Sequence, residues 1–145
     1  DRSPESMLAG TRMAARVIAG FIDDEMKRHD LPAAKIALVG FSQGTMMSLF
    51  VGPRREEPIA GIVGFSGRLI GPELMADEVK TKPPVTLVHG EADEMVPATA
   101  LGQAVSGLEA VGIEVASEMR PHLGHSIDAQ GLRIGLEFLR RVLPE

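Results

Sequence analysis

Cysteine, tryptophan and tyrosine are absent from this sequence, and its only aromatic residues are five phenylalanines. Without cysteine the chain can form neither a disulfide framework nor a thiolate nucleophile, and a reducing, cytoplasmic location is expected. So few aromatic residues provide no platform on which nucleic-acid bases could stack. A net charge of −5, with both signs mixed along the chain, provides no basic stripe for phosphate contacts. Nucleic acid is therefore not an expected partner.

Long apolar runs are missing as well. No apolar stretch reaches the ~18 residues that a membrane-spanning helix needs, and no segment has the pattern of a signal peptide. Stable membrane insertion is therefore not expected. The apolar fraction of 44% and the charged fraction of 24% are those of an ordinary globular protein. A length of 145 residues suits a single domain over residues 1–145.

Helical and strand patterns alternate along the chain. Apolar residues recur at three- and four-residue steps over 5–28, which predicts an amphipathic helix. Residues 35–40 form a nearly continuous apolar run, typical of a strand buried on both faces, whereas residues 113–119 alternate like a strand nearer an edge. Further strands are predicted at 59–65 and 85–89, and further helices at 42–51, 97–111 and 126–142. This order predicts an α/β fold, a mostly parallel sheet with helices on both faces.

A candidate nucleophile lies between the first predicted strand and the helix that follows it. The pentapeptide Gly40-Phe41-Ser42-Gln43-Gly44 has the form G-x-S-x-G, in which a serine sits on a tight, strained strand-to-helix turn. We expect both glycines to be needed because side chains there would collide with neighbouring backbone. The amide of Gln43, at a helix N-terminus, is the predicted oxyanion donor. Ser42 is the predicted nucleophile.

A second Phe-Ser pair provides an internal comparison. Ser66 also follows a predicted buried strand, in Gly64-Phe65-Ser66-Gly67-Arg68, but the fifth residue is arginine and no helical pattern begins there. We interpret Ser66 as a loop residue at the carboxyl end of a strand, near the site but not its nucleophile.

The acid and the base are expected in the loops after the third and fourth strands, because catalytic groups of open α/β sheets gather at the carboxyl ends of strands. Asp93 follows the third strand and is preferred over its neighbours Glu91 and Glu94, which are more simply explained as solvated loop charges. His122 and His125 both lie in the loop after the fourth strand. The order serine, acid, histidine is the order in α/β-hydrolases.

Two features favour His125 over His122 as the general base. Gly124 gives the backbone freedom beside His125, and a predicted helix begins immediately after it at Ser126. His89, at the end of a strand, is predicted to have a structural hydrogen-bonding role. No metal site is predicted, since no cysteine or helical His-Glu motif accompanies the two loop histidines, and no glycine-rich phosphate loop or other cofactor motif is present.

Three ordered motifs together resemble the phospholipase/carboxylesterase family, which includes acyl-protein thioesterases. They are the pentapeptide around Ser42, the segment 89–97 containing Asp93, and Gly124-His125-Ser126. The resemblance covers essentially the whole chain and implies Ser42 as nucleophile, Asp93 as orienting acid and His125 as base. It further implies hydrolysis of short-chain carboxylic esters, lysophospholipids or acyl thioesters, with a small ester or lipid-like molecule as the partner.

Apolar residues near these motifs are candidates for a substrate pocket. Leu69 matches the position where family members place a Ser-Gly-x-Leu segment beside the acyl pocket, and Met95 and Leu123 flank the acid and the base. Ile70, Met46 and Met47 are further candidates, although helix core packing is favoured for at least one of the two methionines.

The chain departs from the family at its N-terminal side. Family members begin with several strands and a histidine-glycine loop that supplies the second oxyanion amide, and nothing here corresponds to them. By the usual size of this fold roughly 70 residues are missing, so the chain is expected to be the C-terminal two-thirds of an α/β-hydrolase fold. The strand before Ser42 should then have an unpaired apolar edge, with which a second copy or another chain could pair.

Two other functions are compatible with parts of this pattern. The missing N-terminal part fits a binding or interaction module that keeps the hydrolase half-fold. Another rival is a dienelactone-hydrolase-like or peptidase-like enzyme of the same fold. The former would carry cysteine at the position of Ser42, and the chain has none.

Overall fold

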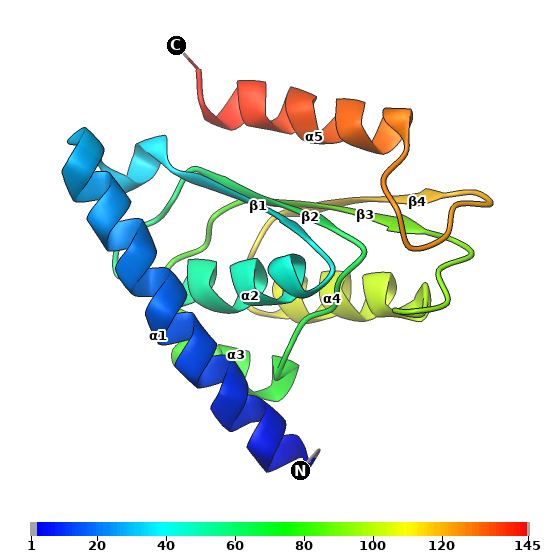
Figure 1. Ribbon diagram of the computed structural model, residues 1–145, viewed down its shortest axis with the longest axis horizontal. Coiled ribbons are helices and arrows are strands. Elements are labelled where there is room, and N and C mark those ends of the chain that lie inside the picture. Colours follow the sequence, from blue (N-terminus) through cyan, green and yellow to red (C-terminus); the bar gives the residue numbers. More distant parts are fainter. Residues whose placement is uncertain (1–2, 145) are drawn as a thin grey trace.

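The sheet is wholly parallel in a computed structural model that describes residues 3–144. Its strands are β1 (Ala37–Phe41), β2 (Gly61–Phe65), β3 (Val85–Gly90) and β4 (Val115–Arg120). They lie side by side in the order β1-β2-β3-β4, so each strand neighbours the next one in sequence (Figure 1). Parallel pairing places the carboxyl ends of all four strands at one edge of the sheet.

Helices cover both faces of this sheet, as the sequence predicts. The helices α2 (Gln43–Val51) and α4 (Thr99–Ala110) lie on one face, and α5 (Ala129–Val142) lies on the other (Figure 1). The long helix α1 (Pro4–His29) packs against α2, and the segment between β2 and β3 contains only the short helix α3 (Met75–Glu78). Short 3₁₀ turns occupy Ala33–Lys35, Gly52–Arg54 and Pro72–Leu74. The predicted α/β architecture is confirmed.

Alternate residues of the strands form two separate apolar cores. Ile62 and Leu87 point toward α2 and α4, where they meet Leu49 and Leu108. The smaller core on the opposite face gathers Val63, Phe65 and Val88 under Phe138 of α5. Burying a side chain of this size stabilises the fold by about 1.5–3 kcal/mol. Both cores therefore hold the central strands β2 and β3 rigidly.

Strand β1 differs from this pattern. It pairs only with β2 among the described residues, and its Val39 is 57% exposed. Val39 and Phe41 pair with Val63 and Phe65, so their side chains lie on the face of the sheet that α5 covers. Helix α5 does not extend over β1, however, and both side chains are exposed. The prediction of a strand buried on both faces is therefore wrong for β1, and the expectation of an open apolar edge is confirmed.

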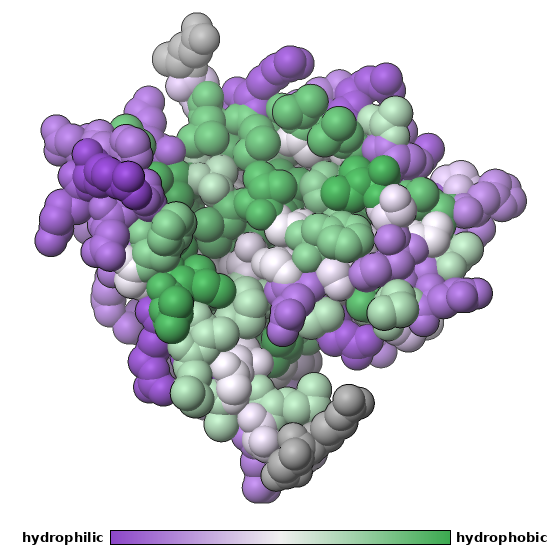
Figure 2. All heavy atoms as spheres, in the orientation of Figure 1, coloured by the Kyte–Doolittle hydropathy of each residue, from purple (hydrophilic) through white to green (hydrophobic). Residues whose placement is uncertain are grey.

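Helix α1 also exposes an apolar stripe. Met13, Val17 and Phe21, spaced four residues apart, are all exposed on the helix. Figure 2 shows extensive apolar surface around α1 and β1. No described helix is long and apolar enough to cross a membrane.

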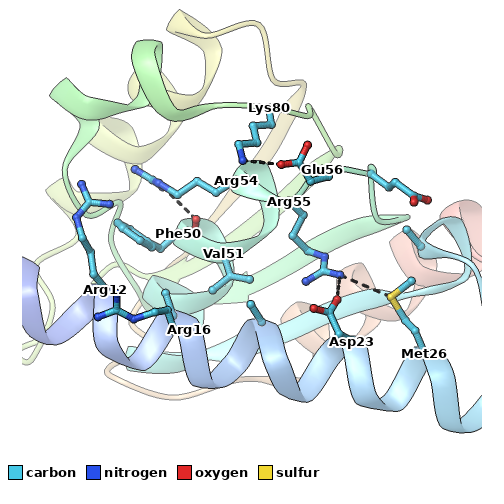
Figure 3. A pocket seen from close by; sticks show the side chains of 14 residues that line it. Arg12, Arg16, Asp23, Met26, Phe50, Val51, Arg54, Arg55, Glu56 and Lys80 are labelled. Carbon is cyan, nitrogen blue, oxygen red and sulfur yellow. Dashed lines mark hydrogen bonds and ion pairs between the residues drawn. The ribbon is translucent and has the colours of Figure 1, made fainter.

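Ion pairs hold α1 to the rest of the fold. Arg12 donates to Glu78 at 2.7 Å, and Arg54 donates to the same carboxylate at 2.8 Å. Further along the helix, Arg55 donates to Asp23 at 2.6 Å (Figure 3). A cleft of about 530 Å³ lies between α1 and the segment after α2 and is lined by Arg12, Asp23, Arg54 and Arg55, among others. The positive charges of the three arginines are thus engaged by carboxylates.

Glu78→Gln should make the protein less sensitive to acid. Hydrogen bonds from Arg12 and Arg54 lower the pKa of Glu78 from 4.5 to about 2. The ionised carboxylate therefore contributes stability above about pH 4.5, which is lost as the pH falls toward 2. We expect Glu78→Gln to lower the free energy of unfolding by about 1–2 kcal/mol at neutral pH, solvent screening included, and to flatten its decline over this window. Urea unfolding at a series of pH values measures both effects.

Glu56→Gln is the matched control, because the Lys80–Glu56 pair is largely exposed. It should leave the pH dependence close to that of the wild type. An equal change in both variants would contradict the special role of Glu78.

Candidate active site

Ser42 occupies the turn between β1 and α2. Its backbone has φ 55° and ψ −115°, a conformation that non-glycine residues rarely adopt. The Ser42 amide donates to the carbonyl of Phe65 at 2.8 Å, so the turn is tied to the end of β2. The sharp turn directs the serine hydroxyl away from α2, whose N-terminus it does not cap. The predicted strained strand-to-helix turn is present.

The two glycines of the pentapeptide differ. A Cβ on Gly40 would lie 2.5 Å from the amide nitrogen of Thr45, so only glycine fits against the first turn of α2. A Cβ on Gly44 would meet nothing within 4 Å. The prediction that both glycines avoid a collision is therefore wrong for Gly44, which is exposed on the outer side of the helix.

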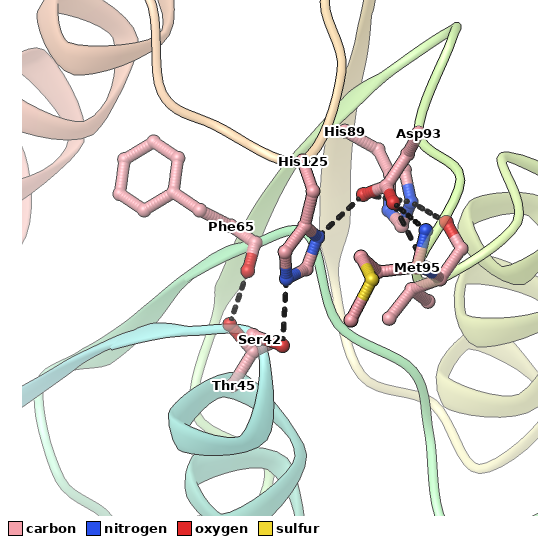
Figure 4. Close-up of polar contacts among 8 residues, drawn as sticks. Ser42, Thr45, Phe65, His89, Asp93, Met95 and His125 are labelled. Atoms are coloured by element: carbon pink, nitrogen blue, oxygen red, sulfur yellow. Dashed lines mark hydrogen bonds and ion pairs between the residues drawn. The ribbon is translucent and has the colours of Figure 1, made fainter.

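Hydrogen bonds link Ser42, His125 and Asp93 in one chain. Nε2 of His125 lies 3.0 Å from Oγ of Ser42, and Nδ1 lies 2.8 Å from Oδ2 of Asp93 (Figure 4). The three residues lie in the segments that follow β1, β3 and β4, as the sequence predicts for parallel strands whose carboxyl ends lie together. Because the carboxylate can only accept, Nδ1 carries a proton and Nε2 is free to accept the serine proton. This connectivity is suited to general-base activation of a hydroxyl.

Asp93 is held as an anion in a dry environment. Its side chain is 0% exposed, and its Oδ1 accepts the amides of Met95 and Val96, each at 2.8 Å. Burial by itself would raise the pKa of Asp93, but the hydrogen bonds from His125 and from the two amides outweigh burial and lower it. The carboxylate therefore stays ionised throughout the neutral range and keeps the imidazole in one tautomer.

Backbone contacts join the loop that carries Asp93 to the loop that carries His125. The amide of Ala92 donates to the carbonyl of Leu123, and the amide of Glu91 donates to that of Arg120, both at 2.8 Å. A Cβ on Gly90 would lie under 3.0 Å from the carbonyl oxygens of Leu123 and Gly124, so this close approach requires glycine. The spacing of the two loops that carry the acid and the base is thus set by the backbone.

The alternative acids and bases lie outside this chain of hydrogen bonds. Glu91 and Glu94 are exposed. His122 is exposed with a positive φ of 62°, and its amide, rather than its ring, approaches Glu91. Ser66 follows β2, is buried and has a φ of 54°, and no described partner lies within hydrogen-bonding distance of its Oγ. Among the described residues, only Ser42 has a hydroxyl hydrogen-bonded to His125.

The remaining predicted site residues are more dispersed. Gln43 is the first residue of α2, where backbone amides have no partner within the helix. Met95 is 73% exposed and lies beside Asp93, and Leu123 is half-buried next to the histidine loop. Leu69 packs with the larger core close to Gly107 of α4. Leu69 thus packs with the core, whereas Met95 and Leu123 lie in the two loops beside the acid and the base.

One contact of His125 was not predicted from the sequence. The ring of Phe41 lies 4.8 Å from the imidazole ring, measured between centroids and tilted by 47°. Phe41 immediately precedes Ser42, but only the fold shows that its side chain turns to the face where His125 lies. Its position within the pentapeptide is the one signal that could have indicated it.

Comparisons with known proteins find relatives that cover most of this chain. The sequence pattern of the phospholipase/carboxylesterase family matches residues 1–143. Acyl-protein thioesterase 1 from Gibberella zeae is 33% identical over 140 residues, which are 93% of this chain and 59% of the thioesterase. Acyl-protein thioesterase 1 homolog 1 from Dictyostelium discoideum is 26% identical over 89% of this chain and 58% of its own length.

Solved structures show the same fold. The crystal structure of esterase PE8 superposes with a TM-score of 0.93 at 37% identity, covering 99% of this chain and 66% of that chain. The SOBER1 protein of Arabidopsis thaliana, at 23% identity, has a TM-score of 0.87 over 93% of this chain and 65% of its own. The chain therefore spans less than two thirds of the length of these relatives.

Gly40→Ala should destabilise the protein far more than Gly44→Ala. The new methyl group at position 40 would push α2 away from β1, at a cost of about 2–4 kcal/mol in the free energy of unfolding. At position 44 the methyl group meets nothing, and alanine favours a helix by about 1 kcal/mol over glycine. Urea unfolding of the two variants measures the difference, and equal effects would contradict the close approach at Gly40.

Proposed function

The chain belongs to the phospholipase/carboxylesterase family, and we propose that it carries the active site of a serine esterase. Its substrates are short-chain carboxylic esters, lysophospholipids or acyl thioesters. The observation that carries the proposal is the chain of hydrogen bonds from Ser42 through His125 to Asp93. The relatives support it, since they are named as thioesterases and an esterase, which are hydrolases.

Catalysis proceeds by two acyl transfers. Oγ of Ser42 attacks the substrate carbonyl carbon while Nε2 of His125 takes the serine proton. Asp93 holds the imidazole in position and stabilises the positive charge that it acquires. His125 then gives the proton to the leaving alcohol or thiol. A water molecule repeats the sequence on the acyl-enzyme, which releases the acid and restores Ser42.

Gln43 supplies one donor for the oxyanion that forms during each attack. Its backbone amide lies at the N-terminus of α2, where the helix dipole favours negative charge. We place the second donor in the part of the relatives that this chain does not cover. β1 ends at Phe41, directly before Ser42, so its open edge is where additional backbone would reach the site. Loss of one such donor costs about 10²–10³ in turnover, so residues 1–145 should turn over slowly by themselves.

The acyl group of the substrate would contact apolar side chains near the acid and the base. Met95 and Leu123 lie in the two loops that carry Asp93 and His125, and Leu69 lies in the loop that follows β2. A flexible, exposed methionine suits acyl chains of different lengths. We propose these three residues as parts of the substrate pocket.

The open apolar surface favours a second candidate function. The exposed edge of β1 and the stripe Met13, Val17 and Phe21 would suit a non-catalytic interaction module. Such a module has no need for a buried, ionised Asp93 hydrogen-bonded to a histidine. Reaction of Ser42 with a serine-hydrolase probe discriminates between the two functions.

Ser42→Ala should abolish labelling by a fluorophosphonate probe, whereas Ser66→Ala should label like the wild type. The reason is that the hydroxyl of Ser42 is hydrogen-bonded to His125, whereas the hydroxyl of Ser66 has no partner among the described residues. Gel fluorescence after a fixed incubation measures the labelling. Persistent labelling of the Ser42→Ala protein would reject the nucleophile, and an unlabelled wild-type protein would favour the interaction module.

His125→Ala should slow labelling by about 10²–10⁴-fold, the usual contribution of a general base, while His122→Ala should slow it by less than about threefold. The two residues share one loop, so His122→Ala also controls for disturbance of that loop. Time courses of labelling give both rates. Equal losses in the two variants would leave His125 without a distinct role.

A further inference from the structure

His89 is the other histidine near the proposed acid, and it is more deeply buried than His125. It lies in β3 and is 1% exposed. Its Nε2 lies 2.9 Å from the carbonyl oxygen of Val96 (Figure 4). Since a carbonyl can only accept a hydrogen bond, this geometry requires a proton on Nε2, and His89 is the donor.

The same nitrogen is close to the carboxylate. Nε2 of His89 lies 3.5 Å from Oδ2 of Asp93, the oxygen that accepts the proton on Nδ1 of His125. The N–H group donates to Val96, and the positive end of its dipole also lies near the Asp93 carboxylate, with which it interacts electrostatically rather than by a hydrogen bond. Both side chains are fully buried, so solvent does not weaken this interaction.

Val96 forms a second link between His89 and Asp93. Its amide donates to Oδ1 of Asp93 at 2.8 Å, and its carbonyl accepts from His89. His89 thereby anchors the loop 93–96 to the rigid strand β3, and the loop in turn holds the carboxylate. Loss of the Nε2 donor would leave the buried carbonyl of Val96 without this partner and would free the loop to move.

We propose that His89 is a positioning residue that fixes the Asp93 carboxylate, and through it the His125 imidazole, without touching the reacting atoms. This proposal rests on the proposed function only where it predicts that His89 substitutions slow the reaction of Ser42. The geometric part concerns the hydrogen bond between Asp93 and His125 and is independent of catalysis.

Three substitutions separate the hydrogen bond from the bulk of the side chain. His89→Gln retains an N–H donor at about the distance of Nε2, whereas His89→Asn has a donor that is one bond too short to reach Val96. His89→Leu removes the donor and keeps an apolar side chain in the core. Ser66→Ala is the matched control, because Ser66 is equally buried, lines the same small cavity as His89 and has no partner among the described residues for its hydroxyl.

The first measurement is the proton NMR signal of the Nδ1–H group of His125, which is shifted far downfield by its bond to a carboxylate. Its loss in Asp93→Asn assigns it. We expect the signal to be broadened or lost in His89→Asn and His89→Leu and preserved in His89→Gln and Ser66→Ala. A purely structural role would lower the unfolding temperature of the Asn and Leu variants and leave the Nδ1–H signal of His125 unchanged.

The second measurement is the rate of fluorophosphonate labelling of the same proteins. We expect about a 10–100-fold loss in the Asn and Leu variants, as for a small misplacement of a catalytic group, and less than about a threefold loss in the Gln variant. If the Leu variant fails to fold, the comparison of Gln with Asn still decides. An unchanged NMR signal in His89→Asn, or equal losses in Gln and Asn, would overturn the proposal. If the NMR signals change as expected but the probe does not label the wild-type protein, the positioning role of His89 is supported and the proposed function is rejected.

Discussion

The close approach of the loops that follow β3 and β4 is the constraint on which the site depends. Gly90 lies against the carbonyls of Leu123 and Gly124, and two backbone hydrogen bonds fix the loops at this distance. The contact brings Asp93 and His125 together although 32 positions separate them in sequence. Because backbone forms the contact, the spacing of the two loops does not depend on flexible side chains.

Ser42 reaches the same place by way of the sheet. Its amide bonds to the end of β2, and the amide of Ser66 bonds in turn to the carbonyl of Val88 in β3. These bonds fix the serine turn relative to the loop that carries Asp93. The two cores on either side of β2 and β3 keep this frame rigid, so the strain at Ser42 is maintained by the packing around it.

Local patterns predicted much of the fold and the residues of the proposed triad. The apolar runs located the strands, and the Gly40–Gly44 motif located the turn because its chemistry depends on adjacent residues. The partner of His89 could not be predicted in this way, since the contact with Val96 depends on how the loop folds back onto β3. The absence of a close neighbour beside Gly44 could not be predicted either, because it depends on which elements pack next to α2. The burial of β1 was predicted wrongly because an apolar run shows only that a strand is suited to burial. Its actual burial depends on which elements pack beside it.

The central claim is that Ser42, His125 and Asp93 act together to form an acyl-enzyme on Ser42. Mass spectrometry of the protein after reaction with p-nitrophenyl acetate tests it directly. We expect a single added acetyl group on the peptide that contains Ser42, absent when Asp93 is replaced by asparagine. Acetylation of lysine residues alone, or equal acetylation of Ser42 in the Asp93→Asn protein, would contradict it.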